Sequence, residues 1–285
     1  KYGADILRIW VASSNYEEDL RIDYSILEQH ADSYRKIRNT FRYLLGNLND
    51  EFQIINVEKL ELNKLPELEQ YMLHKVYDLD KKFKNYFKLY DFHNLYKELL
   101  NFCTLDLSAF YFDIRKDALY CDPKNSEKRK SCIIVLNVIL ESLLKWFAPI
   151  LSFTTEEIFR LTNKEKKSIH LEKFIVLPNL FENQKLNDKW LELKKIRDIC
   201  NISIEAKRAN KEIGSSLEAN LTIKINENLS KVIKDIDLAE LCITSNVEII
   251  KTIKNEVIVE TKKAEGDKCP VCWKISKNRC KRHAQ

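Results

Sequence analysis

Residues 34–48 read YRKIRNTFRYLLGNL, and this stretch decides the fold that the sequence predicts. Its apolar side chains return every three or four positions, which is the spacing of one face of an α-helix. That face carries Ile37, Phe41, Leu44, Leu45 and Leu48. An adjacent face carries Arg35, Arg38 and Arg42. We therefore expect a helix from about residue 24 to residue 49 that packs on one side and presents positive charge on another.

The same spacing recurs along the first half of the chain. It predicts further helices at about 66–88, 91–117 and 125–148. The most apolar run, CIIVLNVILESLL at 132–144, is interrupted by Asn137 and Glu141 and is shorter than the roughly 20 residues that cross a bilayer. We interpret it as a buried helix and expect no membrane association. Thr154 and Glu157 fit a capping box for one more short helix.

Several long helices with short connections predict an antiparallel bundle over residues 23–163. The pattern then changes, because NKEKKS at 163–168 is polar and IHLEKFIVLP at 169–178 indicates an extended segment closed by Pro178. We treat 164–186 as a linker. A helix at about 187–210, followed by the strand-like runs LTIKI, VEII and EVIVE, predicts a small α/β domain over 187–262. The expected fold is thus mainly α, with a small α/β domain and a terminal zinc knuckle.

The zinc knuckle is predicted from CPVCWKISKNRCKRH at 269–283. Two residues separate Cys269 from Cys272, seven precede Cys280, and two more precede His283. Two short turns that each supply two ligands are typical of a tetrahedral zinc site, and four protein ligands leave no position for water or substrate. We expect one structural zinc in a tail over 263–285, after the charged segment TKKAEGDK at 261–268. The alternative, a redox Cys-x-x-Cys pair, requires a helix start that Pro270 in a basic tail does not suggest.

Positive charge gathers around this motif. Residues 268–283 contain no acid and carry Lys268, Lys274, Lys277, Arg279, Lys281 and Arg282. Trp273 directly follows the second cysteine, and its ring either packs on the metal loop or stacks on a base. The residues leave both interpretations open. A solvated helix face is likewise the alternative to polyanion binding by the three arginines of the first helix. The candidate nucleic-acid contacts are Arg35, Arg38, Arg42, Trp273, Lys274, Arg279 and Arg282.

Composition excludes several other classes of site. The chain has 285 residues, 45% hydrophobic and 32% charged, which is typical of a soluble globular protein. A net charge of +5 is too small to identify a partner. Four glycines cannot supply a glycine-rich phosphate loop, and the five histidines show no catalytic spacing, so we expect no catalytic residues. The other five cysteines are predicted to be reduced core thiols of a cytosolic protein: Cys103, Cys121, Cys132, Cys200 and Cys242.

Six stretches together resemble the C-terminal part of bacterial isoleucyl-tRNA synthetases. They are KYGADILRIWVASSNYEEDLRI at 1–22, YRKIRNTFRYLLGNL, FHNLYKELLNFCTLDLSAFYFDIRKDALY at 92–120, WFAPILSFTTEEIF at 146–159, KEIGSSLEA at 211–219 and CPVCWK at 269–274. The matches run nearly end to end and in the family's order. DLSAFYFDIRKD combined with a terminal zinc knuckle favours the isoleucine enzyme over the valyl and leucyl relatives.

The resemblance implies a tRNA-binding fragment of an isoleucine–tRNA ligase. Met72 is the single methionine, so the family's Lys-Met-Ser-Lys-Ser loop is missing, and so is its His-Ile-Gly-His signature. Residues 1–22 would connect to an absent catalytic domain, which alone would bind ATP. The expected partner is the anticodon stem-loop of isoleucine tRNA, bound by a cytoplasmic monomer. The family often has four cysteines and a longer loop, whereas His283 would be the fourth ligand here. The alternative function is a zinc-stapled helical adaptor that binds a protein.

Overall fold

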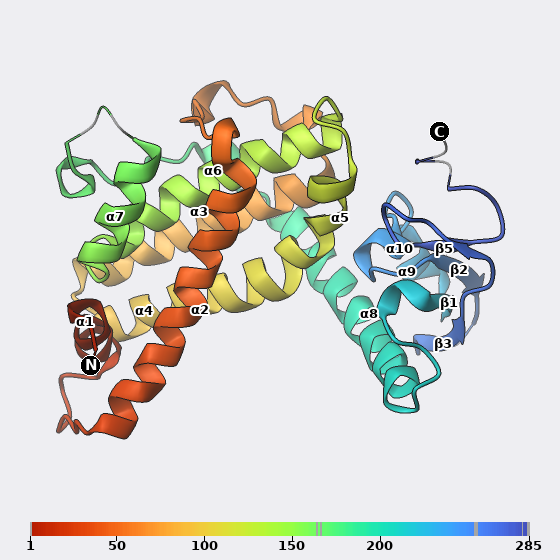
Figure 1. Ribbon diagram of the computed structural model, residues 1–285, viewed down its shortest axis with the longest axis horizontal. Coiled ribbons are helices and arrows are strands. Elements are labelled where there is room, and N and C mark those ends of the chain that lie inside the picture. The colour runs from red at the N-terminus through yellow and green to blue at the C-terminus, as the bar shows by residue number, and fades with distance from the viewer. Residues whose placement is uncertain (1, 164, 166, 254–255, 281, 284–285) are drawn as a thin grey trace. The chain divides into compact units, whose positions relative to one another are not determined.

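The computed structural model describes residues 2–163, 165, 167–253, 256–280 and 282–283 (Figure 1). It divides into two compact units, Lys1–Asn183 and Gln184–Gln285, which we call the helical unit and the α/β unit. None of the helices in the described part combines the length and the apolar character that crossing a membrane requires.

The helical unit is the predicted bundle. Its long elements are α1 (Ala4–Ser13), α2 (Tyr24–Leu48), α3 (Glu67–Lys88), α4 (Phe92–Asn101), the π-helix η4 (Phe102–Phe112), α5 (Asp113–Cys121), α6 (Glu127–Phe147) and α7 (Ser152–Thr162). Short 3-10 turns are η1 (Asn49–Glu51), η2 (Val57–Lys59), η3 (Leu62–Lys64), η5 (Ile169–Leu171) and η6 (Asn179–Phe181). The helices expected at 24–49, 66–88 and 125–148 are confirmed as α2, α3 and α6.

Helix α6 forms the centre of the bundle and packs against α2, α3, α5 and α7. Leu136, Ile139 and Leu143 are fully buried on it. Asn137, which interrupts this apolar run, is 1% exposed. Its polar atoms are satisfied there, because the side chain accepts the Gln53 amide hydrogen at 2.8 Å and donates to the Ile133 carbonyl at 2.9 Å. The polar interruption thus fastens the loop after α2 to the core.

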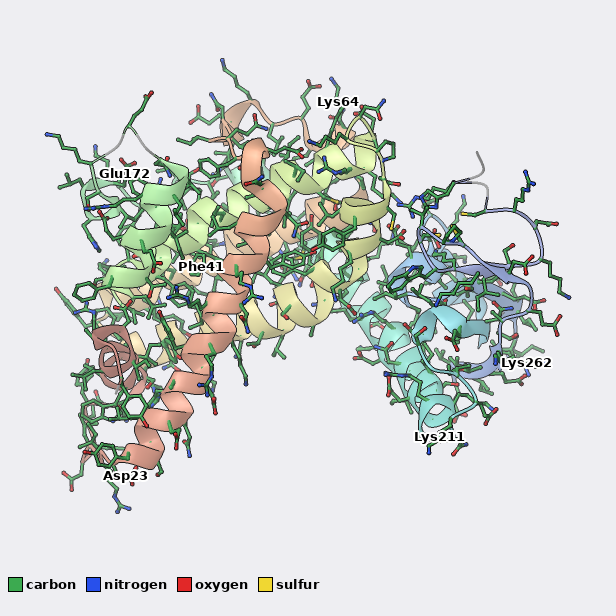
Figure 2. The ribbon with its side chains drawn as sticks, in the orientation of Figure 1. Asp23, Phe41, Lys64, Glu172, Lys211 and Lys262 are labelled. Carbon is green, nitrogen blue, oxygen red and sulfur yellow. The ribbon has the colours of Figure 1, made fainter. Side chains whose placement is uncertain are left out.

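The apolar face of α2 meets this core as predicted. Ile37, Phe41, Leu44 and Leu48 are buried and Leu45 is half-buried. Asp23, which is labelled in Figure 2, caps the helix by accepting the Ile26 amide hydrogen at 2.7 Å. In Figure 1, α2 extends beyond the other helices of the helical unit at the end where it lies beside α1.

The prediction of a single helix at 91–117 is only partly confirmed. The chain is helical from Phe92 to Cys121, but η4 replaces the middle of it with π-helix. A buried ion pair lies beside this segment, because Arg115 donates to both carboxylate oxygens of Glu69 at 2.7 and 2.6 Å. Tyr111 of η4 donates to the same carboxylate at 3.1 Å. The hydrophobic pattern alone did not indicate the change of helix type.

The prediction of a capping box at Thr154 and Glu157 is wrong. Helix α7 already begins at Ser152, and its N-cap residue makes no side-chain cap hydrogen bond. Asp5 of α1 supplies the missing acceptor, taking the amide hydrogens of Phe153 at 3.3 Å and Thr154 at 2.8 Å. Residues 4–13 therefore pack as part of the helical unit, where Ile9 is fully buried.

The segment expected to be extended, 169–178, begins with the 3-10 turn η5 and contains no strand among its residues. Four of the five isolated cysteines are buried as expected, and Cys121 is half-buried.

The α/β unit begins with α8 (Gln184–Ala209), three residues before the expected start. Then follow η7 (Ser216–Glu218), β1 (Ala219–Ile225), α9 (Glu227–Val232), α10 (Leu238–Leu241), β2 (Asn246–Lys251), β3 (Ile258–Lys263), β4 (Asp267–Lys268) and β5 (Ile275–Ser276). The larger sheet has the order β2-β1-β3, with β1 parallel to β2 and antiparallel to β3. Strand β3 includes the first three residues of the charged segment 261–268, so the connection to the tail starts later than predicted.

Buried and half-buried side chains alternate along β1, and this alternation explains how the α/β unit packs. Leu221, Ile223 and Ile225 point to one buried face, as the period of two requires. Helix α8 packs against β3, where the hydroxyls of Ser203 and Thr261 lie 2.7 Å apart.

Candidate metal centre and nucleic-acid interface

The terminal motif forms a small hairpin. Strands β4 and β5 pair antiparallel, and the turn between them holds Cys269 and Cys272. The amide of Cys269 donates to the Lys274 carbonyl at 2.9 Å, and the amide of Trp273 donates to the Cys269 carbonyl at 3.0 Å. Gly266 enters the hairpin at φ 120°, and a Cβ there would lie 2.2 Å from the Ser276 carbonyl oxygen. Only glycine fits this position without moving the backbone.

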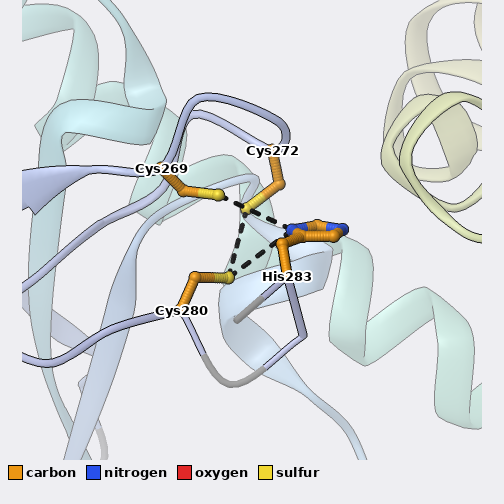
Figure 3. A group of neighbouring side chains, drawn as sticks. All are labelled: Cys269, Cys272, Cys280 and His283. Atoms are coloured by element: carbon orange, nitrogen blue, oxygen red, sulfur yellow. Dashed lines mark hydrogen bonds between the residues drawn. The ribbon is translucent and has the colours of Figure 1, made fainter. Parts of the chain in front are cut away.

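Four side chains converge at this turn (Figure 3). Cys269, Cys272, Cys280 and His283 each offer one donor atom, and the four atoms lie within 4.8 Å of one another. The Sγ atoms of Cys272 and Cys280 are 3.8 Å apart. His283 Nδ1 lies 3.6 Å from Cys269 Sγ and 3.5 Å from Cys280 Sγ. The predicted ligands are therefore a cluster able to hold a metal ion.

The two cysteines of the first turn differ electrostatically. Hydrogen bonding from the Cys272 backbone amide lowers the pKa of the Cys269 thiol to about 6. Burial first, and then the neighbouring Cys269 and Cys280 side chains, raise the pKa of the Cys272 thiol to about 12. Thiolates packed this closely repel one another, so a cation among them favours the deprotonated, metal-binding form of all three.

Trp273 has an unusual conformation for a large side chain. Its φ is 63°, in the left-handed region that favours glycine, yet 58% of the residue is exposed. The Lys268 Nζ lies 5.2 Å from its ring centroid, within cation–π range. Sequence reasoning counted Lys268 only as part of the basic run. Its position directly before Cys269, with Trp273 directly after Cys272, could have indicated that the two flank the same turn.

Ser245 attaches the hairpin to the larger sheet. Its hydroxyl accepts the amide hydrogen of Ile275 in β5 at 2.6 Å and donates to the Leu217 carbonyl at 2.5 Å. The Ser245 amide donates to Ala219 at the start of β1. Sequence reasoning missed this link, because no local pattern connects positions 245 and 275.

The other candidate contacts in the tail occupy varied positions. Arg279 and Arg282 are exposed, whereas Lys274 is half-buried. Lys277 forms an ion pair of 2.6 Å with Glu265, an acid that precedes the basic run. Lys281 lies outside the described residues.

The arginines of α2 all reach the surface of the helical unit. Arg35, Arg38 and Arg42 are exposed along the helix, so we call them the arginine stripe. Arg35 pairs with Asp32 one turn away. Arg38 donates to the Tyr34 hydroxyl at 2.9 Å and lies 3.5 Å from Glu157. Exposed ion pairs of this kind are weak, so both guanidinium groups remain available to an anion.

Comparison with known families identifies the middle of the chain. A model for the anticodon-binding domain of tRNA ligases matches residues 69–225, from α3 to the end of β1. The chain belongs to this anticodon-binding domain family. The arginine stripe lies on α2, which ends before the matched region begins, and the metal cluster lies after that region.

Three proteins similar to this chain carry the same name. An isoleucine–tRNA ligase from Pelagibacter ubique is 72% identical over 284 residues, covering all of this chain and 31% of that protein. Isoleucine–tRNA ligases from Agrobacterium fabrum and Zymomonas mobilis are 39% and 38% identical, over 96% and 95% of this chain. Each of these two matches covers 29% of the relative. The chain thus spans about three-tenths of the length of these relatives.

Proposed function

We propose that this chain is the tRNA-binding portion of an isoleucine–tRNA ligase, and that it holds the anticodon stem-loop of isoleucine tRNA. The observation that carries the proposal is the family match over 69–225 together with 72% identity to a protein of that name. A full-length ligase would supply the chemistry elsewhere. The chain would act as a monomer in the cytoplasm.

We further propose that the metal is zinc. A tetrahedral zinc ion with bonds of about 2.3 Å to sulfur and 2.0–2.1 Å to nitrogen separates its sulfur ligands by about 3.8 Å and sulfur from nitrogen by about 3.5–3.6 Å. Three of the six separations here match these values, at 3.8 Å for Cys272–Cys280 and 3.5 and 3.6 Å for the contacts of His283, and all four donor atoms lie within 4.8 Å of one another. This agreement supports a Cys3His zinc site. Because all four corners are protein side chains, the ion would shape the tail without taking part in a reaction.

Trp273 is the proposed stacking surface for a base. A left-handed backbone costs a side chain other than glycine about 1–2 kcal/mol. Packing within its own loop does not explain a tryptophan at that cost, because 58% of the residue is exposed. An anticodon loop presents unstacked bases, and aromatic rings bind these without needing a particular sequence. Lys268 on the ring adds a charge that attracts the adjoining phosphates.

The remaining candidates would contact the backbone of the RNA. Arg35, Arg38, Arg42, Lys274, Arg279 and Arg282 are proposed to bind phosphates or base edges. Such contacts release condensed cations, so binding should weaken with salt. An adaptor that docked a protein through an apolar groove would instead bind with little dependence on salt.

The test compares equilibrium binding of this chain to isoleucine tRNA and to a tRNA with a different anticodon at several salt concentrations. The proposal predicts tighter binding of isoleucine tRNA at every salt concentration. Equal affinity for both tRNAs would contradict anticodon recognition, and the absence of binding to either would contradict the tRNA-binding role.

A further inference from the structure

Helix α1 is fixed across the corner between α6 and α7 by two oppositely charged side chains. Asp5 is 6% exposed and accepts two amide hydrogens at the start of α7. Arg8, one turn later, donates to the carbonyl oxygens of Ile150 at 2.7 Å and Pro149 at 2.6 Å, just after α6 ends. A carboxylate at a helix start and a guanidinium after a helix end both match the helix dipoles. Figure 1 shows α1 lying beside α7 and the N-terminal half of α2.

A chain of hydrogen bonds leads from this corner to the surface. The Thr154 hydroxyl lies 2.6 Å from Asp5 Oδ2 and 2.9 Å from the Tyr34 hydroxyl of α2. The Tyr34 oxygen is 2.9 Å from Arg38 Nη1. Four side chains from α1, α7 and α2 are thus connected in series, from a buried carboxylate to an exposed guanidinium.

The chemistry of the two ends fixes the direction of every bond. Arginine only donates, so the Tyr34 oxygen must accept from Arg38 and direct its own hydrogen to Thr154. An ionised carboxylate only accepts, so Thr154 must donate to Asp5. All donors therefore point the same way, an arrangement in which neighbouring hydrogen bonds polarise and strengthen one another.

This connection distinguishes Arg38 from its neighbours in the arginine stripe. Arg35 is paired within its own helix, with Asp32. Arg42 takes part in no hydrogen bond or ion pair between described residues. The hydrogen bond to the Tyr34 oxygen, and then the electrostatic interaction with the same group, raise the pKa of Arg38 above its usual value. The Arg38 guanidinium therefore already has two partners before any ligand arrives, the Tyr34 hydroxyl at 2.9 Å and Glu157 at 3.5 Å, and the Tyr34 contact connects it to the buried Asp5 carboxylate.

We propose that Tyr34 and Thr154 are positioning residues, which hold the Arg38 guanidinium oriented for a phosphate of the bound RNA and rest on the Asp5 carboxylate. The inference rests on the proposed tRNA-binding function. An arginine that is already ordered loses less rotamer freedom on binding, so the same phosphate contact gives a higher affinity. Neither Tyr34 nor Thr154 needs to touch the RNA.

The test is a double-mutant cycle on the affinity of this chain for isoleucine tRNA. Arg38→Ala, Tyr34→Phe and the double variant are compared with the parent. We expect Tyr34→Phe to weaken binding about threefold to fivefold in the parent and to have no effect in the Arg38→Ala background, because contacting partners are not additive. Tyr43→Phe is the matched control, since its hydroxyl also leaves α2 to donate to another element, at 3.3 Å from the Phe112 carbonyl. It should leave affinity unchanged.

A second pair of variants guards against loss of folding. Thr154→Val removes the central hydroxyl, whereas Thr154→Ser keeps it. The valine variant should weaken binding as Tyr34→Phe does, and the serine variant should bind like the parent. Circular dichroism establishes that each variant retains the helical unit.

The outcomes separate the inference from the function on which it rests. If Arg38→Ala leaves affinity unchanged, Arg38 does not contact the RNA and both ideas fail for this residue. If Arg38→Ala weakens binding but Tyr34→Phe does not, only the positioning role is overturned. An equal effect of Tyr34→Phe in the parent and in the Arg38→Ala background also overturns it, because the loss of affinity then does not depend on Arg38.

Discussion

The Lys268 ammonium lies 5.2 Å from the centre of the Trp273 ring, at a turn whose two cysteines belong to the metal cluster. The ammonium group therefore covers part of the indole ring, while 58% of Trp273 is exposed to solvent. The two residues flank Cys269 and Cys272, so metal binding and the proposed stacking surface depend on the same backbone hydrogen bonds of this turn.

Replacing Trp273 separates stacking from packing. Trp273→Gly removes the ring and also relieves the left-handed strain, so the tail should be at least as stable and hold the same amount of metal. Binding of isoleucine tRNA should nevertheless fall about tenfold, since a base–aromatic stack contributes about 1–3 kcal/mol. Trp273→Ala should lose the same affinity. If either variant binds tRNA like the parent with its metal in place, the ring has no stacking role.

The metal cluster predicts one equivalent of zinc in freshly purified protein. Cys272→Ser should abolish metal retention and unfold the tail, because metal binding supplies roughly 10 kcal/mol or more of folding free energy in such small modules. Cys121→Ser is the control, since Cys121 lies outside the cluster and is half-buried. Elemental analysis measures the zinc, and circular dichroism should show the helices unchanged. Well under one equivalent in unchelated parent protein would refute the site.

Two glycines should respond to alanine in opposite ways. Gly266→Ala should destabilise the hairpin and reduce metal retention, because the added Cβ would lie 2.2 Å from a backbone oxygen at φ 120°. Gly46→Ala has nothing within 4 Å of its added Cβ and lies inside α2. It should stabilise the helical unit by about 0.5–1 kcal/mol, the usual gain of alanine over glycine in a helix. Thermal unfolding and metal content distinguish the two, and a shift of the same sign in both would contradict the geometry.

His74 predicts an acid-sensitive helical unit. It is 5% exposed, burial lowers its pKa, and its Nδ1 accepts the Asn183 amide hydrogen at 3.1 Å. Because the folded-state pKa lies below the unfolded value, the unfolded state binds more protons as pH falls through about 6.5 and stability is lost there. His74→Gln should reduce the slope of unfolding free energy between about pH 7.5 and 5.5. Burial lowers the pKa of His30 as well, so some slope should remain. Identical slopes would exclude His74 as a source.

Local and repeated signals explain what the sequence could predict. Ile37, Phe41 and Leu44 recur with the helix period, and that period alone placed α2 and its buried face correctly. The cluster of Cys269, Cys272, Cys280 and His283 follows from spacing, because short turns must bring their own ligands together.

Contacts between distant positions account for what the sequence could not predict. Asp5 caps α7 from 149 positions away. The local sequence around Thr154 therefore predicts a capping box, whereas the acceptor comes from another helix. The bond from Ile275 to Ser245 and the pair of Glu69 with Arg115 likewise join segments that no periodicity relates. The left-handed φ of Trp273 was also hidden, since tryptophan gives no sign of a position that glycine would favour.

The central claim is that this chain holds the anticodon end of a tRNA, and competition between pieces of one tRNA tests it most directly. Labelled isoleucine tRNA bound to the chain is displaced with either its isolated anticodon stem-loop or its isolated acceptor stem, at one fixed salt concentration. The proposed function predicts that the anticodon stem-loop displaces the tRNA and that the acceptor stem does not. Displacement by the acceptor stem alone, or equally by both pieces, would contradict it.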